Sequence, residues 1–244
     1  MADKITAQIS ELRSLDGMRR EMVANVSHDL RTPLTTMRGY LETLLIKNGE
    51  LSPVQQKQYL ETALRHSQRL GKLVDELFEL ARLESCESVV YSEPFSMGEL
   101  VQDITQSYLL RAEQESIRLE SSLNPDAPLV YGDIAMMQRV LENLIENGLR
   151  HTPEGGRIGI RVDVDSGNVV VQVTDTGCGI PAEDVPQIFE RNYRKDKNGS
   201  GSGTGLGLAI VRRILELHGS VIRVHSEPEL GTTFSFHIAA RPVA

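Results

Sequence analysis

The stretch SHDLRTPL, residues 27–34, places a histidine inside a helix, with an acid directly after it and a threonine one turn later. An α-helix turns by about 100° per residue, so apolar residues three or four apart form one stripe. The stripe consists of Val26, Leu30, Pro33, Met37, Leu41 and Leu44. His28 falls opposite it, on the face that we expect to be exposed. An exposed imidazole is a competent nucleophile, because its usual pKa of about 6.5 leaves it mostly neutral at pH 7.

Apolar residues at steps of three and four predict one long helix over residues 1–47. Pro33 should kink this helix, since proline removes a helical hydrogen bond. Ser52 is placed to cap a second helix, with Pro53 in its first turn. Two antiparallel helices with narrow apolar faces bury little surface alone. We therefore predict a helical hairpin that pairs with a second copy, as a homodimer with a four-helix bundle.

Composition is that of an ordinary soluble protein, with 40% hydrophobic and 25% charged residues. The net charge of −8 argues against a nucleic-acid-binding surface. Cys86 and Cys178 have no metal-binding or redox spacing. No apolar run approaches the roughly 18 residues that span a bilayer, and no signal peptide is visible. We expect the chain as given to be soluble.

The spacing of apolar residues changes after Glu84, where a linker with a short strand covers residues 85–95. Helices and strands then alternate, and the late strands follow one another as hairpins. This order predicts an α+β two-layer sandwich rather than a βαβ sheet. The predicted elements are a helix from the Ser96–Glu99 capping box to Glu115, a strand over 117–123, a helix from Asp133 to Arg150, strands over 157–164 and 168–174, a helix over 204–218, and strands over 220–226 and 232–239.

Two polar segments lie within this second part. In NLIENGLRHT, residues 143–152, Asn143 and Asn147 are one helical turn apart and share a face. Their neutral oxygens suit a Mg²⁺ ion that also binds phosphate, although surface asparagines would look the same. In DTGCGIP, residues 175–181, a carboxylate ends an apolar strand and can accept a hydrogen bond from an exocyclic amine such as that of adenine. A plain glycine-rich turn is the alternative.

Two further segments follow. IFERNYRK, residues 188–195, leads into a polar stretch and suits a lid that meets phosphates, or else a solvated loop. In GTGLGLAIV, residues 203–211, glycines run directly into an apolar helix, whose bare amides form an anion site. The glycine spacing matches neither the Rossmann nor the P-loop pattern, so those two nucleotide-binding classes are excluded.

The octapeptide resembles the phosphoacceptor box of sensor histidine kinases of the HisKA class. The four later segments, in this order, resemble the N, G1, F and G2 boxes of the GHKL (Bergerat) ATP-binding fold. Gly231-Thr232-Thr233-Phe234 resembles the last glycine turn of that family. The resemblance covers residues 21 to about 240.

The resemblance also predicts the domain organisation. Residues 1–20 resemble the end of a HAMP linker, although a plain coiled-coil extension is possible. We expect a signal helix over 1–20, a dimerisation and phosphotransfer domain over 21–86, and a catalytic ATP-binding domain over 87–244. The chain would be the cytoplasmic portion of a bacterial inner-membrane protein, joined to the membrane only through a transmembrane segment absent from this chain.

The resemblance implies a reaction, in which His28 receives a phosphoryl group from MgATP and passes it to an aspartate of a response regulator. Asp29 would orient and polarise the imidazole. Thr32 would position a water molecule that dephosphorylates the regulator. The nucleotide would be held by Asn143, Asn147, Arg150, His151, Asp175, Gly177, Gly179, Arg194, Gly203, Thr204, Gly205, Leu206 and Gly207, with Asn147 and Asn143 at the Mg²⁺ ion.

Two residues depart from the family pattern. Gly148 replaces a more usual alanine, which weakens its helix by roughly 1 kcal/mol. Asn192 replaces an aromatic residue, so the lid should be anchored more loosely. Two other functions remain open. A GHKL ATPase without a phosphoacceptor would use a glutamate where this chain has Asn143. A degenerate kinase could act as a scaffold, although the intact His28 and glycine run speak against that.

Overall fold

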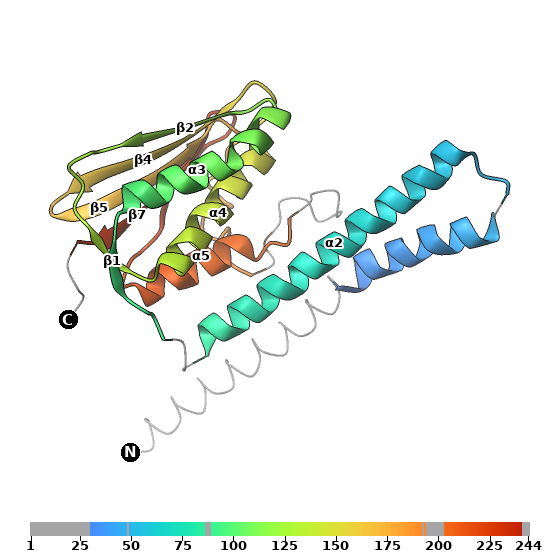
Figure 1. Ribbon diagram of the computed structural model, residues 1–244, viewed down its shortest axis with the longest axis horizontal. Coiled ribbons are helices and arrows are strands. Elements are labelled where there is room, and N and C mark those ends of the chain that lie inside the picture. The colour runs from blue at the N-terminus through green and yellow to red at the C-terminus, as the bar shows by residue number, and fades with distance from the viewer. Residues whose placement is uncertain (1–29, 48, 86–88, 192, 194–202, 241–244) are drawn as a thin grey trace, which may run out of the picture. The chain divides into compact units, whose positions relative to one another are not determined.

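The computed structural model describes residues 30–47, 49–85, 89–191, 193 and 203–240 (Figure 1). The chain divides into two compact units, residues 1–75 and 76–244. The predictions for residues 1–29, including the helical position of His28, lie outside the described residues.

The first unit contains a helical hairpin. One helix covers residues 30–46, and α2 (Pro53–Glu84) begins after a turn and continues into the second unit. Ser52 caps α2 as predicted: the Gln55 amide donates to its hydroxyl at 3.3 Å, and its own amide donates to the Gln55 side chain at 3.0 Å. The rings of Tyr40 and Tyr59, 5.3 Å apart, join the two helices. The hairpin is therefore confirmed.

The second unit is built on a mixed five-stranded sheet, with three helices against one face (Figure 1). The strand order is β2-β4-β5-β7-β6, and β1 and β3 form a separate pair. The elements are β1 (Glu93–Phe95), α3 (Met97–Gln114), β2 (Arg118–Leu123), β3 (Val130–Gly132), α4 (Ile134–His151), β4 (Arg157–Asp165), β5 (Asn168–Asp175), α5 (Gly207–Leu217), β6 (Arg223–Glu227) and β7 (Gly231–Ala239).

The α+β two-layer sandwich is confirmed, with two differences in detail. Strand β2 pairs with β4 in parallel, because β3 and α4 lie between them in the chain; the other pairs in this sheet are antiparallel. Helix α5 begins at Gly207 rather than at the predicted Thr204. Gly205 has a φ of +79°, which a right-handed helix cannot contain.

The core lies between the sheet and the helices. Alternate residues of β5, Val169, Val171 and Val173, are buried, as strand periodicity requires. They pack under the apolar face of α4, which includes Val140 and Leu144. This packing fixes the far end of α4 and the end of β5, where the polar segments lie. Within the described residues, no helix is long and apolar enough to span a bilayer.

Candidate nucleotide-binding site

Helix α4 presents Asn143 toward the start of α5. Asn143 is buried, and its side-chain nitrogen makes no hydrogen bond to any described residue. A Cβ at Gly207 would stand 3.1 Å from the Asn143 carboxamide oxygen, so glycine leaves room there. A buried amide without a partner is costly, and a phosphate oxygen would satisfy it. Asn147, one turn later on α4, is half-buried.

Arg150 and His151 are the last residues of α4 and are exposed. The guanidinium of Arg150 packs against the glycine-rich segment, since a Cβ at Gly203 would lie 2.8 Å from its Nη1 atom. A positive charge therefore lies beside the backbone that the sequence predicted to hold phosphates. The structure brings these two predicted segments together, although 53 positions of the chain separate the two residues.

Asp175 ends β5, where its side chain is buried and accepts a hydrogen bond from the Gly177 amide at 2.9 Å. Burial raises the pKa of Asp175, against the opposing effect of the amides of Gly177 and Thr232. A buried carboxylate with a fixed orientation is suited to accept one specific N–H group. This is the geometry that recognition of an adenine amine requires.

The loop after Asp175 needs its two glycines. A Cβ at Gly177 would lie 2.5 Å from the carbonyl oxygen of His151, and Gly179 has a φ of +65°. The Cys178 amide donates to the same His151 carbonyl at 3.2 Å. The loop is thereby tied to the end of α4, so Asp175, His151 and Arg150 belong to one site.

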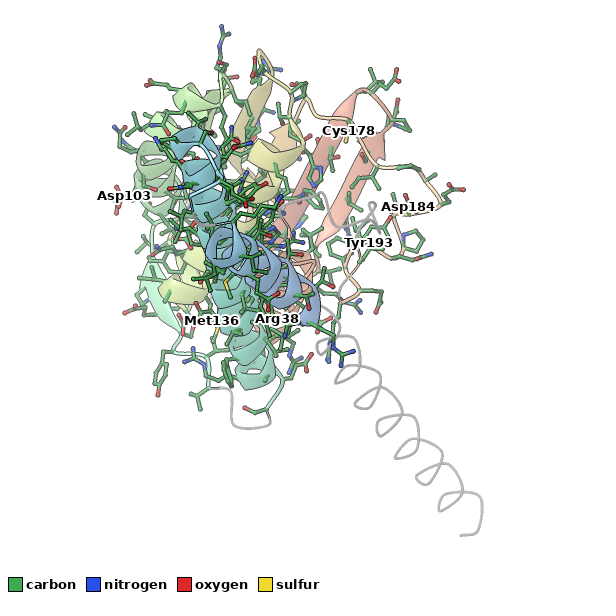
Figure 2. The ribbon with its side chains drawn as sticks, turned by 90° about the vertical axis from the view of Figure 1, so that its right-hand side faces the viewer. Arg38, Asp103, Met136, Cys178, Asp184 and Tyr193 are labelled. Carbon is green, nitrogen blue, oxygen red and sulfur yellow. The ribbon has the colours of Figure 1, made fainter. Side chains whose placement is uncertain are left out.

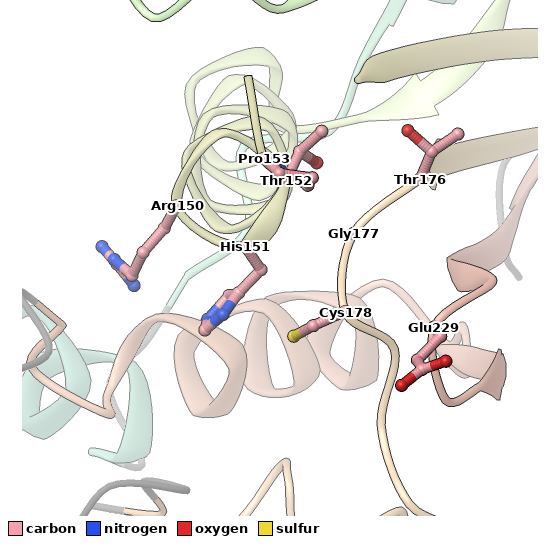
Figure 3. A pocket seen from close by; sticks show the side chains of 8 residues that line it. All are labelled: Arg150, His151, Thr152, Pro153, Thr176, Gly177, Cys178 and Glu229. Atoms are coloured by element: carbon pink, nitrogen blue, oxygen red, sulfur yellow. The ribbon is translucent and has the colours of Figure 1, made fainter. Parts of the chain in front are cut away.

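A pocket of about 410 Å³ opens between this loop and the end of α4 (Figure 3). Three predicted residues line it: Arg150, His151 and Gly177. In Figure 3 the side chain of Cys178 points from the loop toward the end of α4, where His151 lies. Sequence reasoning missed its other lining residues, Thr152, Pro153, Thr176, Cys178 and Glu229. Glu229 lies in the turn between β6 and β7, two residues before the Gly231–Phe234 motif, and only the fold brings this turn beside the end of α4.

The predicted lid segment is anchored by its first residues. The ring of Phe189 meets that of Phe234 edge to face, with centroids 6.3 Å apart, and Ile188 is buried. Burial and then a hydrogen bond to Asp184 raise the pKa of Tyr193 to about 12, and Figure 2 shows the two residues near each other. Arg194 and Asn192 lie outside the described residues.

The glycine-rich segment leads into the N-terminus of α5, where backbone amides can bind an anion. Leu206, at the N-cap of α5, has no side chain that can cap the helix, so no cap from this residue competes with a ligand for the first amides of α5. The Leu206 amide lies 3.4 Å from the Thr204 hydroxyl, which is buried. With Asn143 facing Gly207, the residues present fit a triphosphate and its Mg²⁺ ion.

Of the predicted phosphoacceptor residues, the structure describes only Thr32. It is exposed on the helix over residues 30–46, and its carbonyl accepts a hydrogen bond from the Thr36 hydroxyl at 3.0 Å. His28 and Asp29 lie outside the described residues. Pro33 lies within the described helix over residues 30–46, and the kink at this residue stays a prediction.

Two family models match the chain. Residues 18–86 match the His Kinase A (phospho-acceptor) domain. Residues 132–242 match the histidine kinase-, DNA gyrase B- and HSP90-like ATPase.

Curated relatives match nearly the whole chain. Drug sensory protein A of Synechocystis is 38% identical in an alignment that covers 92% of this chain and 35% of that protein. Sensor-like histidine kinase SenX3 of Mycolicibacterium smegmatis is 34% identical over 96% of this chain and 60% of its own length. The chain thus spans about one third of the length of the first relative and 60% of the second.

Solved structures of similar fold include the histidine kinase ThkA in complex with the response regulator protein TrrA. The match has a TM-score of 0.78 and 27% identity, over 94% of this chain and 64% of that one. The histidine kinase AdeS of Acinetobacter baumannii matches with a TM-score of 0.71 and 26% identity, over 88% of this chain and 98% of that one. A third neighbour, ShkA, was solved in complex with AMPPNP, at a TM-score of 0.67 and 26% identity, over 91% of this chain and 47% of that one.

Proposed function

Since this chain belongs to the sensor histidine kinase family, we propose that it phosphorylates itself on His28 with ATP and passes the phosphoryl group to an aspartate of a response regulator. One observation carries the nucleotide half of the proposal. Asn143 is buried with its carboxamide oxygen toward Gly207 at the start of α5, its side-chain nitrogen makes no hydrogen bond to any described residue, and the buried carboxylate of Asp175 lies in the same unit.

Different residues of the site would bind different parts of the nucleotide. Asp175 accepts the adenine amine, while Arg150 and the amides of α5 bind the phosphates. Asn147 and Asn143 would hold Mg²⁺ through their side-chain oxygens. When bound, this ion supplies positive charge at the phosphate oxygens.

The transfer itself requires positioning more than covalent help from the protein. The Nε2 lone pair of His28 forms an N–P bond as the bond between the terminal phosphorus and its bridging oxygen breaks, and ADP leaves. Asp29, the next residue in the chain, would orient and polarise the imidazole. The phosphoryl group then moves to the aspartate of the regulator, which frees His28 for another cycle.

The partner is a response regulator, as the ThkA complex with TrrA suggests by analogy. Thr32 is exposed and accessible to such a partner. It would position the water molecule that removes phosphate from the regulator, so the chain would also act as a phosphatase.

We further propose that the chain works as a homodimer. Large apolar side chains are exposed on the helical hairpin, including Leu34, Leu41, Leu45, Leu60 and Leu64. A second copy would cover them in a four-helix bundle. The proposed boundaries remain 1–20, 21–86 and 87–244, and we place the chain on the cytoplasmic side of a bacterial inner membrane.

Incubation with γ-labelled ATP and Mg²⁺ tests this function directly. We expect acid-labile label on the wild type and on the control variant His225→Gln, whose ring is exposed on β6. His28→Gln should carry none. Equal label on His28→Gln would reject the phosphoacceptor, while ATP hydrolysis without protein label would favour a GHKL ATPase. Nucleotide binding without label would favour a scaffold.

A further inference from the structure

A buried carboxylate lies near the end of α2, inside the second unit. Glu76 is 2% exposed, and it accepts a short hydrogen bond from the hydroxyl of Thr204, which is 5% exposed. Thr204 belongs to the glycine-rich segment before α5, so this contact joins two positions 128 residues apart. Neither the octapeptide nor the four nucleotide-site segments includes Glu76.

The contact is one of several that hold residues 76–84, the last part of α2, against the other elements of the second unit. Leu80 and Leu83 are buried, and the Leu83 carbonyl accepts a hydrogen bond from Arg213 on α5 at 3.1 Å. Arg191, in the predicted lid segment, forms an ion pair with Glu84. The end of α2 is therefore held by the same elements that surround the proposed phosphate site.

Arg139 is one cation close to Glu76. Arg139 on α4 lies 2.9 Å from Glu79, but 4.0 Å from both Glu76 and Glu142. One guanidinium thus serves three carboxylates. The Glu76 carboxylate lies directly beside the Thr204 hydroxyl, so an anion that approaches Thr204 also approaches this carboxylate.

Thr204 can satisfy only one acceptor at a time. A hydroxyl has a single proton to donate, and here that proton goes to Glu76. Its lone pair lies 3.4 Å from the Leu206 amide, one of the groups at the start of α5. A triphosphate in the glycine-rich segment would bring a second anionic acceptor to the same place.

We infer that Glu76 is a regulatory residue that opposes ATP binding: its carboxylate takes the Thr204 proton and repels the triphosphate while the end of α2 is docked. The inference rests on the proposed nucleotide site and states what would regulate its affinity for ATP. Coupling between two sites is reciprocal, so bound ATP loosens the hold of Thr204 on Glu76 by the same factor. Residues 76–84 thereby link a helix of the hairpin to nucleotide affinity.

Binding of a non-hydrolysable ATP analogue to the full chain, measured by calorimetry with Mg²⁺, tests the inference. Glu76→Gln keeps the shape of the side chain but removes its charge, and should bind the analogue about five- to tenfold more tightly than the wild type. Glu76→Ala should show at least the same gain. Glu79→Gln is the matched control, because Glu79 is on the same helix and bonds the same Arg139 but not Thr204. We expect it to leave the affinity unchanged.

A double-mutant cycle decides whether the effect passes through Thr204. Thr204→Val removes the hydroxyl and keeps the branched shape, so Glu76→Ala should gain less in that background than in the wild type. An equal gain in both backgrounds overturns the inference, as does unchanged or weaker binding by both Glu76 variants. Failure of the wild type to bind the analogue would instead refute the nucleotide site itself. Circular dichroism of each variant establishes that it is folded.

Discussion

Asp175, which we propose accepts the adenine amine, is buried at a cost in stability. Its carboxylate is buried at the end of β5, and burial raises its pKa, although the amides of Gly177 and Thr232 act in the opposite direction. A native state that raises this pKa favours the protonated acid. The stabilisation from Asp175 is therefore complete below the ordinary aspartate pKa of about 3.9 and is lost as the pH rises through the raised value.

Asp175→Asn should separate the two effects. At pH 7 we expect the variant to gain roughly 1 kcal/mol in unfolding free energy, because it no longer buries an ionised group. We also expect ATP-analogue affinity to fall about tenfold, since the charged acceptor is lost. Urea unfolding at several pH values would show the stability gain vanish below pH 3.9, where wild-type Asp175 is protonated. A gain independent of pH would contradict this account.

At Gly148, packing against β4 opposes the residue that helix propensity favours. Helix propensity alone predicts that alanine would stabilise α4 by about 1 kcal/mol at this position. A Cβ there would lie 3.1 Å from Cδ1 of Ile158, which is fully buried on β4. The contact is closer than normal packing allows, so Ile158 would have to move.

We therefore predict that Gly148→Ala gains much less than about 1 kcal/mol in the wild type. Ile158→Val removes the Cδ1 atom and makes room, at its own cost of about 1 kcal/mol. In the Ile158→Val background, Gly148→Ala should recover the full propensity gain. Urea denaturation of the four chains measures this coupling, and additive effects would show that Ile158 does not constrain position 148.

At the scale of elements, the start of α4 depends on Asp133. Its side chain accepts a hydrogen bond from the Met136 amide at 3.1 Å and lies 3.4 Å from the Tyr91 amide, while its own amide donates to His218 at 3.0 Å. The cap thus joins α4 to the segment before β1 and to the end of α5. Since α4 carries Asn143 and Asn147, the cap also supports the site.

Asp133→Ala should lower the unfolding free energy by about 1 kcal/mol, because it leaves the first amides of α4 without their cap. Asp133→Ser should restore most of this loss, since serine is also a good cap. Asp126→Ala, at an exposed loop position, is the control and should change little. Thermal or urea unfolding followed by circular dichroism provides the measurement. Equal unfolding free energies for Asp133→Ala and the wild type would show that the Asp133 cap does not stabilise α4.

At the scale of the whole molecule, the exposed apolar side chains of the hairpin favour association with a second copy of the chain. Leu60 is 55% exposed on α2, and it follows the heptad spacing that predicted a bundle. A charge at such a position would be buried without compensation in a dimer.

Leu60→Glu should therefore shift the chain from dimer to monomer, as measured by analytical ultracentrifugation. Gln58→Glu adds the same charge at an exposed position of the same helix, and should leave the dimer intact. A wild type that sediments as a monomer at micromolar concentration would refute the bundle, whatever the variants do.

Sequence patterns that span only a few residues were sufficient to predict most helices and strands. Ser52, Ser96 and Asp133 each cap the helix that the sequence predicted, because a cap acts within one turn. The order of the four nucleotide segments likewise pointed to the ATPase domain. The three-residue strand β3 was missed, since so short a segment has no periodicity of its own.

The amino-acid sequence by itself determined the helix caps, the alternation of strands and the presence of a histidine motif followed by a nucleotide-binding pattern, because these depend on neighbours within a few positions. Only the tertiary structure decided that β2 pairs in parallel with β4, that Ile158 crowds Gly148, and that Glu76 takes the hydroxyl of Thr204. Those contacts join residues that are far apart along the chain. Their strength depends on burial and packing, which arise only once the sheet and its helices have assembled.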